Sequence, residues 1–202
     1  LAAHDAGLEI PAILDTREAG GGPLASEAAA RGIRILNGHG IAKVSGPGRV
    51  AAAAICRQDG DGTVLETIPC DAVAMSGGWS PVVHLWSHCG GKLLWDEATA
   101  AFHPDPARAP IGADGAPNVL PAGAAAGAAD LAAAVAQAHA AGARAAGTDP
   151  GTAPAADAPE EAAPQQVWMM PARAKPALRA KAWLDFQNDV KVSDVQLAAR
   201  EG

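Results

Sequence analysis

The chain has 202 residues, 15 Lys and Arg against 22 Asp and Glu, and a formal net charge of −7. This sign disfavours a nucleic-acid partner, because neutralising phosphates needs clustered Lys and Arg. About a quarter of the residues are Ala, so the 49% hydrophobic content overstates the bulk available for a core. We expect an Ala-rich α/β chain with a thin core and disordered stretches.

Neither a membrane span nor a signal peptide is expected, because no run of 18 apolar residues and no basic-then-apolar leader occurs. Cys56, Cys70 and Cys89 lack C-x-x-C spacing. That pattern favours reduced thiols in a cytoplasmic protein over a disulfide framework or a zinc site. The chain starts at Leu1 and stops within a helical pattern at residues 200–202. We therefore expect it to be a piece of a longer protein.

The first 36 residues predict a β-α-β unit that follows the end of a helix at residues 1–6. An apolar strand is expected at residues 10–14, a helix at 23–31 and a second strand at 33–36. Short connections between these elements are typical of a parallel sheet.

Residues 38–69 change to short apolar runs separated by Pro-Gly and Asp-Gly pairs. The runs cover residues 41–44, 50–57 and 64–68. Because these pairs favour hairpin turns, an antiparallel β-meander is expected.

The second half alternates predicted strands, one long helix and a polar stretch. Strands are expected at residues 71–75, 92–96, 118–123 and 182–186, a long Ala-rich helix at 128–146, and a helix start at Ser193 with a Ser193-x-x-Gln196 capping box. Residues 148–166 are rich in Pro, Ala and acidic groups, which predicts a linker.

Two glycine-containing turns are candidate ligand positions. Gly77 and Gly78 follow the predicted strand 71–75, where ligands of open α/β sheets bind. The segment Gly123-Ala124-Ala125-Ala126-Gly127 precedes the long helix, whose free N–H groups suit a dinucleotide pyrophosphate. An ordinary turn at the first position and close helix–sheet packing at the second are equally compatible with these residues.

Two further positions carry weaker signals. Asp15 ends a strand, the position at which a nucleotide-binding fold places an acidic group for ribose hydroxyls, or it is simply a solvated strand end. His84 and His88 have the i, i+4 spacing of a helical metal pair, but a third ligand is not evident, so a surface or packing role is favoured. No G-x-S-x-G, P-loop or complete catalytic constellation occurs, so no catalytic residue is assigned.

Three stretches resemble one known family. They are C-D-A-V-A-M-S-G-G-W-S-P-V-V-H-L at residues 70–85, G-G-K-L-L-W-D-E at 90–97 and K-A-W-L-D-F-Q-N-D-V at 181–190. These stretches are similar to the α subunit of heterotetrameric sarcosine oxidase.

The resemblance implies part of a Rossmann-like, disulfide-reductase-like FAD/NAD(P)-binding domain with a β-meander, followed by the start of a second, α+β domain. The corresponding limits are residues 1–147 for the first domain, 148–166 for a linker, and 167–202 for the start of an aminomethyltransferase-like, folate-binding domain.

The family further implies NAD in this subunit, and FAD, FMN and tetrahydrofolate in the whole complex. It implies β, γ and δ subunits as partners, no membrane, and oxidative demethylation of sarcosine to glycine, hydrogen peroxide and formaldehyde or 5,10-methylenetetrahydrofolate. The nucleotide contacts carry over to Gly123, Ala124, Gly127, Ala129 and Leu131, the last two through their backbone. The chain alone is expected to have no oxidase activity.

Two alternatives stay open at this point. One is the large subunit of a related two-component amine, opine or D-amino-acid dehydrogenase, which would not need the D-F-Q-N-D-V segment. The other is a non-catalytic interaction module, for which residues 148–166 and the basic stretch 173–181 would serve as a partner-binding arm.

Overall fold

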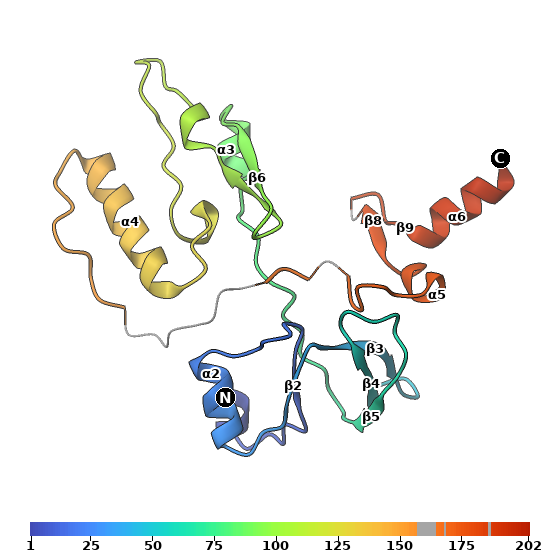
Figure 1. Ribbon diagram of the computed structural model, residues 1–202. Coiled ribbons are helices and arrows are strands. Elements are labelled where there is room, and N and C mark those ends of the chain that lie inside the picture. Colours follow the sequence, from blue (N-terminus) through green and yellow to red (C-terminus); the bar gives the residue numbers. More distant parts are fainter. Residues whose placement is uncertain (157–164, 168, 186) are drawn as a thin grey trace. The chain divides into compact units, whose positions relative to one another are not determined.

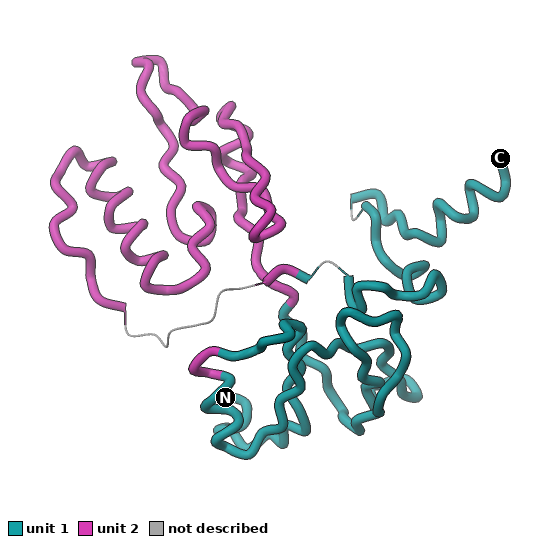
Figure 2. The backbone as a smooth tube through the Cα atoms, viewed as in Figure 1, with its two compact units in different colours: residues 1–21, 25–76, 167–202 teal, residues 22–24, 77–166 magenta. Residues whose placement is uncertain are grey.

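The computed structural model describes residues 1–156, 165–167, 169–185 and 187–202. They form two compact units (Figure 2). Unit 1 contains residues 1–21, 25–76 and 167–202, and unit 2 contains residues 22–24 and 77–166. The 77–166 stretch of unit 2 is thus inserted, in sequence, between two stretches of unit 1. The predicted domain limits at residues 147 and 166 stay a prediction.

Unit 1 begins with the predicted β-α-β unit, whose elements are α1 (Ala2–Asp5), β1 (Ile13–Asp15), α2 (Pro23–Ala30) and β2 (Ile35–Asn37) (Figure 1). The two strands pair in parallel, with Ile13 opposite Ile35. Ala28 of α2 and Ile33 are buried, so the apolar side of the helix contributes to the small core. The expected parallel arrangement is confirmed, although β1 begins three residues later than predicted.

The predicted meander is also present in unit 1. Its strands are β3 (His39–Ser45), β4 (Ala52–Arg57) and β5 (Glu66–Pro69), paired antiparallel in the order β3-β4-β5. The central strand β4 holds Ala53, Ile55 and Cys56, all buried. A strand with neighbours on both edges satisfies its backbone groups in the sheet, which is why β4 carries most of this core.

The end of the chain adds α5 (Pro176–Arg179), β8 (Trp183–Asp185), β9 (Val190–Lys191) and α6 (Val192–Glu201). Strands β8 and β9 are antiparallel, and the Lys191 ammonium lies 4.5 Å from the centre of the Trp183 ring. The predicted capping box at Ser193 and Gln196 is wrong. The helix begins at Val192, and the Asp194 carboxylate accepts the Lys191 N–H at 2.8 Å, because it is the acid three residues beyond the cap that reaches back.

Unit 2 consists of short elements followed by one long helix. They are α3 (His84–His88), β6 (Leu93–Asp96), β7 (Ala101–Pro104), the 3-10 turns η1 (Pro106–Arg108) and η2 (Gly123–Ala126), and α4 (Leu131–Ala146). Strands β6 and β7 form an antiparallel hairpin, of which only the first strand was predicted. Within the part of the chain described here, no helix is both long and apolar enough to cross a membrane.

Two predicted strands are absent from the described residues. Residues 71–75 form no strand, and Met75 is 70% exposed. An apolar run becomes a buried strand only beside partner strands, and the parallel sheet of the described residues contains β1 and β2 alone. Residues 118–122 are likewise irregular, and Gly123 begins a 3-10 turn.

The predicted linker at residues 148–166 lies partly outside the described residues, since 157–164 are not described. Its described residues contain no helix or strand.

Candidate nucleotide-binding site

The turn before α4 has the backbone shape expected of a glycine-rich approach to a ligand. Gly123 and Gly127 both adopt left-handed conformations, with φ of 62° and 90°. Their N–H and C=O groups close the turn, because Gly127 N–H donates to Ala124 O at 3.1 Å and Ala128 N–H donates to Gly123 O at 3.0 Å. Both glycines are required here, since a side chain at positive φ is strained.

The N-terminus of α4 already has an anionic cap. Asp130 precedes the helix, and its carboxylate accepts the Ala133 N–H at 2.7 Å. The N–H groups of the first helical turn have no acceptor within a helix, so those of Leu131 and Ala132 are available for a ligand. The carboxylate of Asp130 also opposes a second anion at this helix end. Ala129 and Leu131 are exposed, which leaves their backbone reachable.

The β6–β7 hairpin supports the turn at Gly127. A Cβ at Gly127 would overlap the imidazole of His103 on β7. The other ring nitrogen, Nε2, lies 2.8 Å from Thr99 Oγ1, and Thr99 donates to Asp96 at 2.7 Å. Because Thr99 has one hydroxyl proton, donating it to Asp96 leaves Oγ1 to accept Nε2–H from His103.

Ionisation of Asp96 fits this direction of hydrogen bonding. The Thr99 hydroxyl is the largest influence that holds the pKa of Asp96 below its usual value, with the Ala98 N–H next. Asp96, Thr99 and His103 therefore form a chain of hydrogen bonds that fixes the imidazole against Gly127. No motif in the sequence assigns a role to these residues. The one sequence signal for part of this hydrogen-bond chain is an Asp three residues before a Thr, a spacing that favours a side-chain hydrogen bond in a tight turn.

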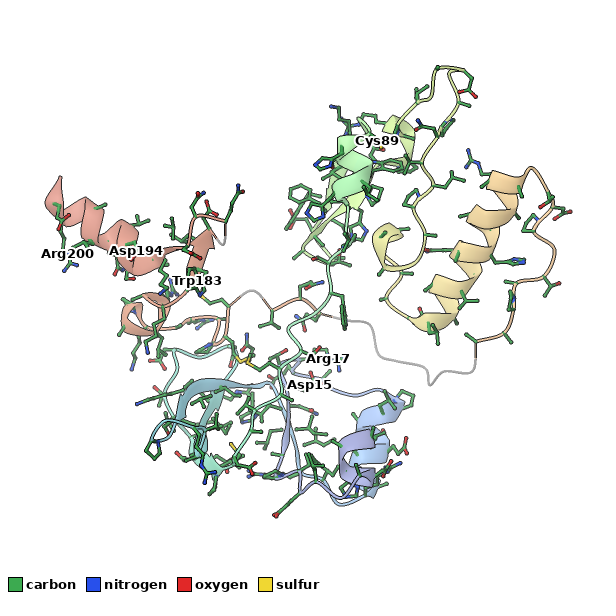
Figure 3. The ribbon with its side chains drawn as sticks, turned by 180° about the vertical axis from the view of Figure 1, so that it is seen from behind. Asp15, Arg17, Cys89, Trp183, Asp194 and Arg200 are labelled. Carbon is green, nitrogen blue, oxygen red and sulfur yellow. The ribbon has the colours of Figure 1, made fainter. Side chains whose placement is uncertain are left out.

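Asp15 lies in unit 1, whereas the other candidate positions lie in unit 2. Its carboxylate is held by Arg17, whose backbone N–H and Nε reach Oδ1 at 2.9 Å each and whose Nη2 reaches Oδ2 at 2.6 Å (Figure 3). These bonds from Arg17 lower the pKa of Asp15. Both carboxylate oxygens are therefore engaged, and a ribose hydroxyl at Asp15 would have to share them with Arg17.

Gly77 and Gly78 are exposed and lie in an irregular segment, not at the end of a strand. Gly78 has a φ of 112°, and a Cβ there would overlap the side chain of Gln166. The Gln166 amide donates to Trp79 O. These glycines therefore form a close approach within the chain, as the ordinary-turn interpretation expects, and the structure gathers no other candidate site residue around them.

His84 and His88 are the first and last residues of α3, and both are exposed. Among the described residues, no group of three or more His, Cys, Asp or Glu side chains is placed to hold a metal ion. The buried side chain of this helix is Trp86, whose Nε1–H donates to Lys92 O at 2.7 Å. Cys56, Cys70 and Cys89 are free thiols, and burial raises the pKa of Cys56.

Taken together, the groups gathered at residues 123–131 are backbone donors, small side chains and a helix N-terminus. Such an arrangement is of the kind that can accommodate an anionic ligand through its backbone.

Comparison with known proteins identifies relatives over nearly the whole chain. It is 33% identical to the sarcosine oxidase subunit alpha of Rhizobium meliloti (strain 1021) over 203 aligned positions, which cover 98% of this chain and 18% of that protein. It is 31% identical to the same subunit of Corynebacterium sp. (strain U-96), over 96% of this chain and 20% of that protein. No protein-family model matches the chain.

A second Corynebacterium subunit alpha, from strain P-1, is 35% identical over 121 positions, which cover 54% of this chain and 12% of that protein. The chain spans about a fifth of the length of the two relatives that match nearly all of it. The resemblance predicted from residues 70–97 and 181–190 is therefore confirmed, and the chain is similar to one segment of the sarcosine oxidase α subunits.

Proposed function

We propose that this chain is part of a sarcosine oxidase α subunit and contributes nucleotide binding to the oxidative demethylation of sarcosine. The observation that carries the proposal is the similarity to subunit alpha over 98% of the chain. The products would be glycine, hydrogen peroxide and either formaldehyde or 5,10-methylenetetrahydrofolate.

NAD is the cofactor that we assign to this subunit, and the backbone of the turn is compatible with it. Gly123, Ala124 and Gly127 present a surface free of bulky side chains, and the first N–H groups of α4, at Leu131 and Ala132, suit a pyrophosphate. Ala129 would contribute through its backbone. A bound nicotinamide dinucleotide supplies hydride chemistry, while the chain supplies binding and orientation.

Two acidic groups bear on this assignment. Asp130 would lie beside the pyrophosphate, so its charge would weaken nucleotide binding while its cap stabilises the empty helix. Asp15 would reach a ribose only by sharing its oxygens with Arg17. The backbone of the Gly123–Gly127 turn therefore carries the proposal, and neither carboxylate is needed for it.

FAD, FMN and tetrahydrofolate, with β, γ and δ subunits, belong to the proposed complex outside this chain. Sarcosine oxidation is assigned to those parts, so the 202 residues alone should form no peroxide from sarcosine.

The test is to purify the product of the complete natural reading frame with the proteins encoded beside it. Denaturation should release NAD, measured by chromatography, and sarcosine should drive peroxide formation. Gly123→Val should lower the retained NAD, because a β-branched residue at a φ of 62° distorts the turn. The matched control is Gly151→Val, which makes the same change at a φ of 59° in another loop.

Each failure has a distinct meaning. Sarcosine oxidation with an acceptor other than oxygen would favour the dehydrogenase alternative. Absence of any released nucleotide, together with retained partner subunits, would favour an interaction module. Equal amounts of retained NAD in the Gly123→Val and Gly151→Val proteins would show that the turn is not part of the nucleotide-binding site.

A further inference from the structure

The segment after the polar stretch returns to unit 1 and lies along the loop between β4 and β5. Ala172 N–H donates to Gln58 O at 2.7 Å, Arg173 N–H to Gly60 O at 2.9 Å and Lys175 N–H to Asp61 O at 3.2 Å. We name residues 169–178 the docking segment. Its backbone thus pairs with three carbonyl groups of the β4–β5 loop, residues 58–65.

Side chains of the docking segment are buried where it meets the meander. Pro171 is fully buried and Ala174 is only 4% exposed. The Met170 side chain lies against Gly40 of β3 so closely that a Cβ there would overlap it, and Met170 Sδ accepts the Ile41 N–H at 3.2 Å. Leu178 fills the space beside Gly62 in the same way. Two glycines of unit 1 therefore leave room for two side chains of the docking segment.

Charge and side-chain hydrogen bonds reinforce the same contact. Lys175 Nζ lies 3.2 Å from Asp61 Oδ2, and the Gln58 amide donates to Met169 O at 2.9 Å. Asp61 is ionised over the whole neutral and mildly acidic range, since Thr63 and then Lys175 lower its pKa to about 2. The docking segment is consequently held by main-chain bonds, buried side chains and an ion pair at once.

The two ends of unit 2 are joined to each other as well. The first residues of its 77–166 stretch, at 77–79, meet the last residue, because the Gln166 amide donates to Trp79 O and its side chain covers Gly78. The 77–166 stretch therefore starts and ends at neighbouring residues, after which the chain continues in unit 1 at residue 167.

We propose that the β4–β5 loop and Gly40 form a docking surface for residues 169–178, so that the C-terminal elements stay attached to unit 1 without the covalent connection through unit 2. The occupant of this surface is the chain's own docking segment. The 77–166 stretch is in that sense an insertion. Elements β8, β9 and α6 are then anchored to unit 1 through the docking segment, and the polar stretch before it is not needed to hold them.

The test uses the 202-residue chain with the recognition sequence of a site-specific protease placed within residues 150–156, a described stretch with no helix or strand. After cleavage, the two pieces are applied to gel filtration at about 10 μM, where a complex with a micromolar or lower Kd stays together. We expect the pieces to elute as one species. Separate elution of the two pieces overturns the proposal.

A matched pair of substitutions identifies the contact. Ala174→Asp places a carboxylate at the buried position, and Ala177→Asp makes the same change at an exposed position of α5. The cut Ala174→Asp protein should separate, while the cut Ala177→Asp protein should stay together. If Ala174→Asp leaves the pieces associated, the docking segment is not what holds them.

A second measurement does not depend on whether the Ala174→Asp chain folds. A synthetic peptide of residues 167–182 is added to the cut wild-type protein, with the Ala174→Asp peptide as control. The wild-type peptide should displace the C-terminal piece at least about tenfold more effectively, a difference of about 1.4 kcal/mol. Equal displacement by both peptides contradicts a docking surface that recognises the buried face of the segment.

Discussion

Strand β4 of unit 1 and helix α4 of unit 2 are held in different ways. Three of the six residues of β4 are buried, and Ile55 is completely so. None of the 16 residues of α4 is buried, although the helix is the longest element of the described chain. Its ends are closed by local groups, the Asp130 carboxylate at one end and Gly147, with a φ of 67°, at the other.

Regular structure in this chain is therefore stabilised in two ways. The strand depends on pairing along both of its edges, with β3 on one side and β5 on the other, and on the burial that this pairing allows. The helix depends on Ala propensity and on its caps, which are all encoded within about 20 residues. Substitutions should therefore have large effects in the first region and effects limited to single local groups in the second.

The largest expected effect comes from the meander core. Ile55→Ala should destabilise unit 1 by about 2–5 kcal/mol, because it removes a completely buried side chain and leaves a cavity. Chemical denaturation followed by circular dichroism measures the change. Leu131→Ala is the matched change in α4, at a residue 54% exposed, and should cost less than about 0.5 kcal/mol. Equal costs would mean that α4 is held by burial after all.

The next largest expected effect is a difference in stability between substitutions at two glycines of unit 2. Gly127→Ala should destabilise by about 1–3 kcal/mol, because Gly127 has a φ of 90° and its new Cβ would overlap His103. Gly142→Ala should instead stabilise α4 by up to about 1 kcal/mol, since Gly142 lies within the helix in open space. Thermal unfolding of both variants measures the difference.

Adding His103→Ala to Gly127→Ala should restore part of the lost stability, because it removes the overlap and leaves only the backbone strain. Strictly additive costs would contradict the assigned contact between the imidazole and Gly127.

A smaller effect is expected at the cap of α4. Asp130→Ala should cost about 1 kcal/mol, because the Ala133 N–H loses its acceptor. Asp130→Asn keeps an acceptor and removes the charge, so it should retain most of the helix and strengthen NAD binding. Circular dichroism and nucleotide titration check the two parts of this prediction. Weaker NAD binding by Asp130→Asn would contradict this prediction, because it would mean that the charged carboxylate favours nucleotide binding.

The smallest effect concerns the ion pair of the docking segment. The pKa of Asp61 in the folded protein, about 2, lies below the ordinary value of 3.8. Its contribution to stability is therefore present above the ordinary value and is lost as the pH falls through the folded value.

Thr63→Val should raise the pKa of Asp61 more than Lys175→Ala does, because the Thr63 hydroxyl is the larger influence. Carboxyl titration by NMR measures both shifts. Thr67→Val, at an exposed residue of β5, is the control and should leave the Asp61 pKa unchanged. A larger rise with Lys175→Ala would assign the lowered pKa mainly to the ion pair.

Much of the fold could be predicted because its signals are local. Gly32, with a φ of 79°, ends α2 as expected, and the Pro-Gly and Asp-Gly pairs lie at the predicted meander turns. The failures are runs whose meaning depends on distant partners. Residues 71–75 are as apolar as a buried strand, yet no strand of the described residues pairs with them.

The candidate site divides in the same way. The small residues at 123–127 could be singled out from the sequence as a turn before a helix, whereas the left-handed conformations of Gly123 and Gly127 are seen only in the structure. That His103 supports Gly127, and that Arg17 occupies Asp15, could not be anticipated, since neither contact follows from a motif. Whether these residues bind NAD stays a prediction.

The sequence by itself determined the order of the early elements, the turns of the meander and the relation to sarcosine oxidase α subunits, because each depends on residues close together in the chain. Only the tertiary structure decided where the chain re-enters unit 1. The contacts of Met170 and Pro171 with the meander join positions more than 100 residues apart, as the Met170–Ile41 pair at a separation of 129 shows. Such pairing is set by shape and burial, to which local propensity gives no guide.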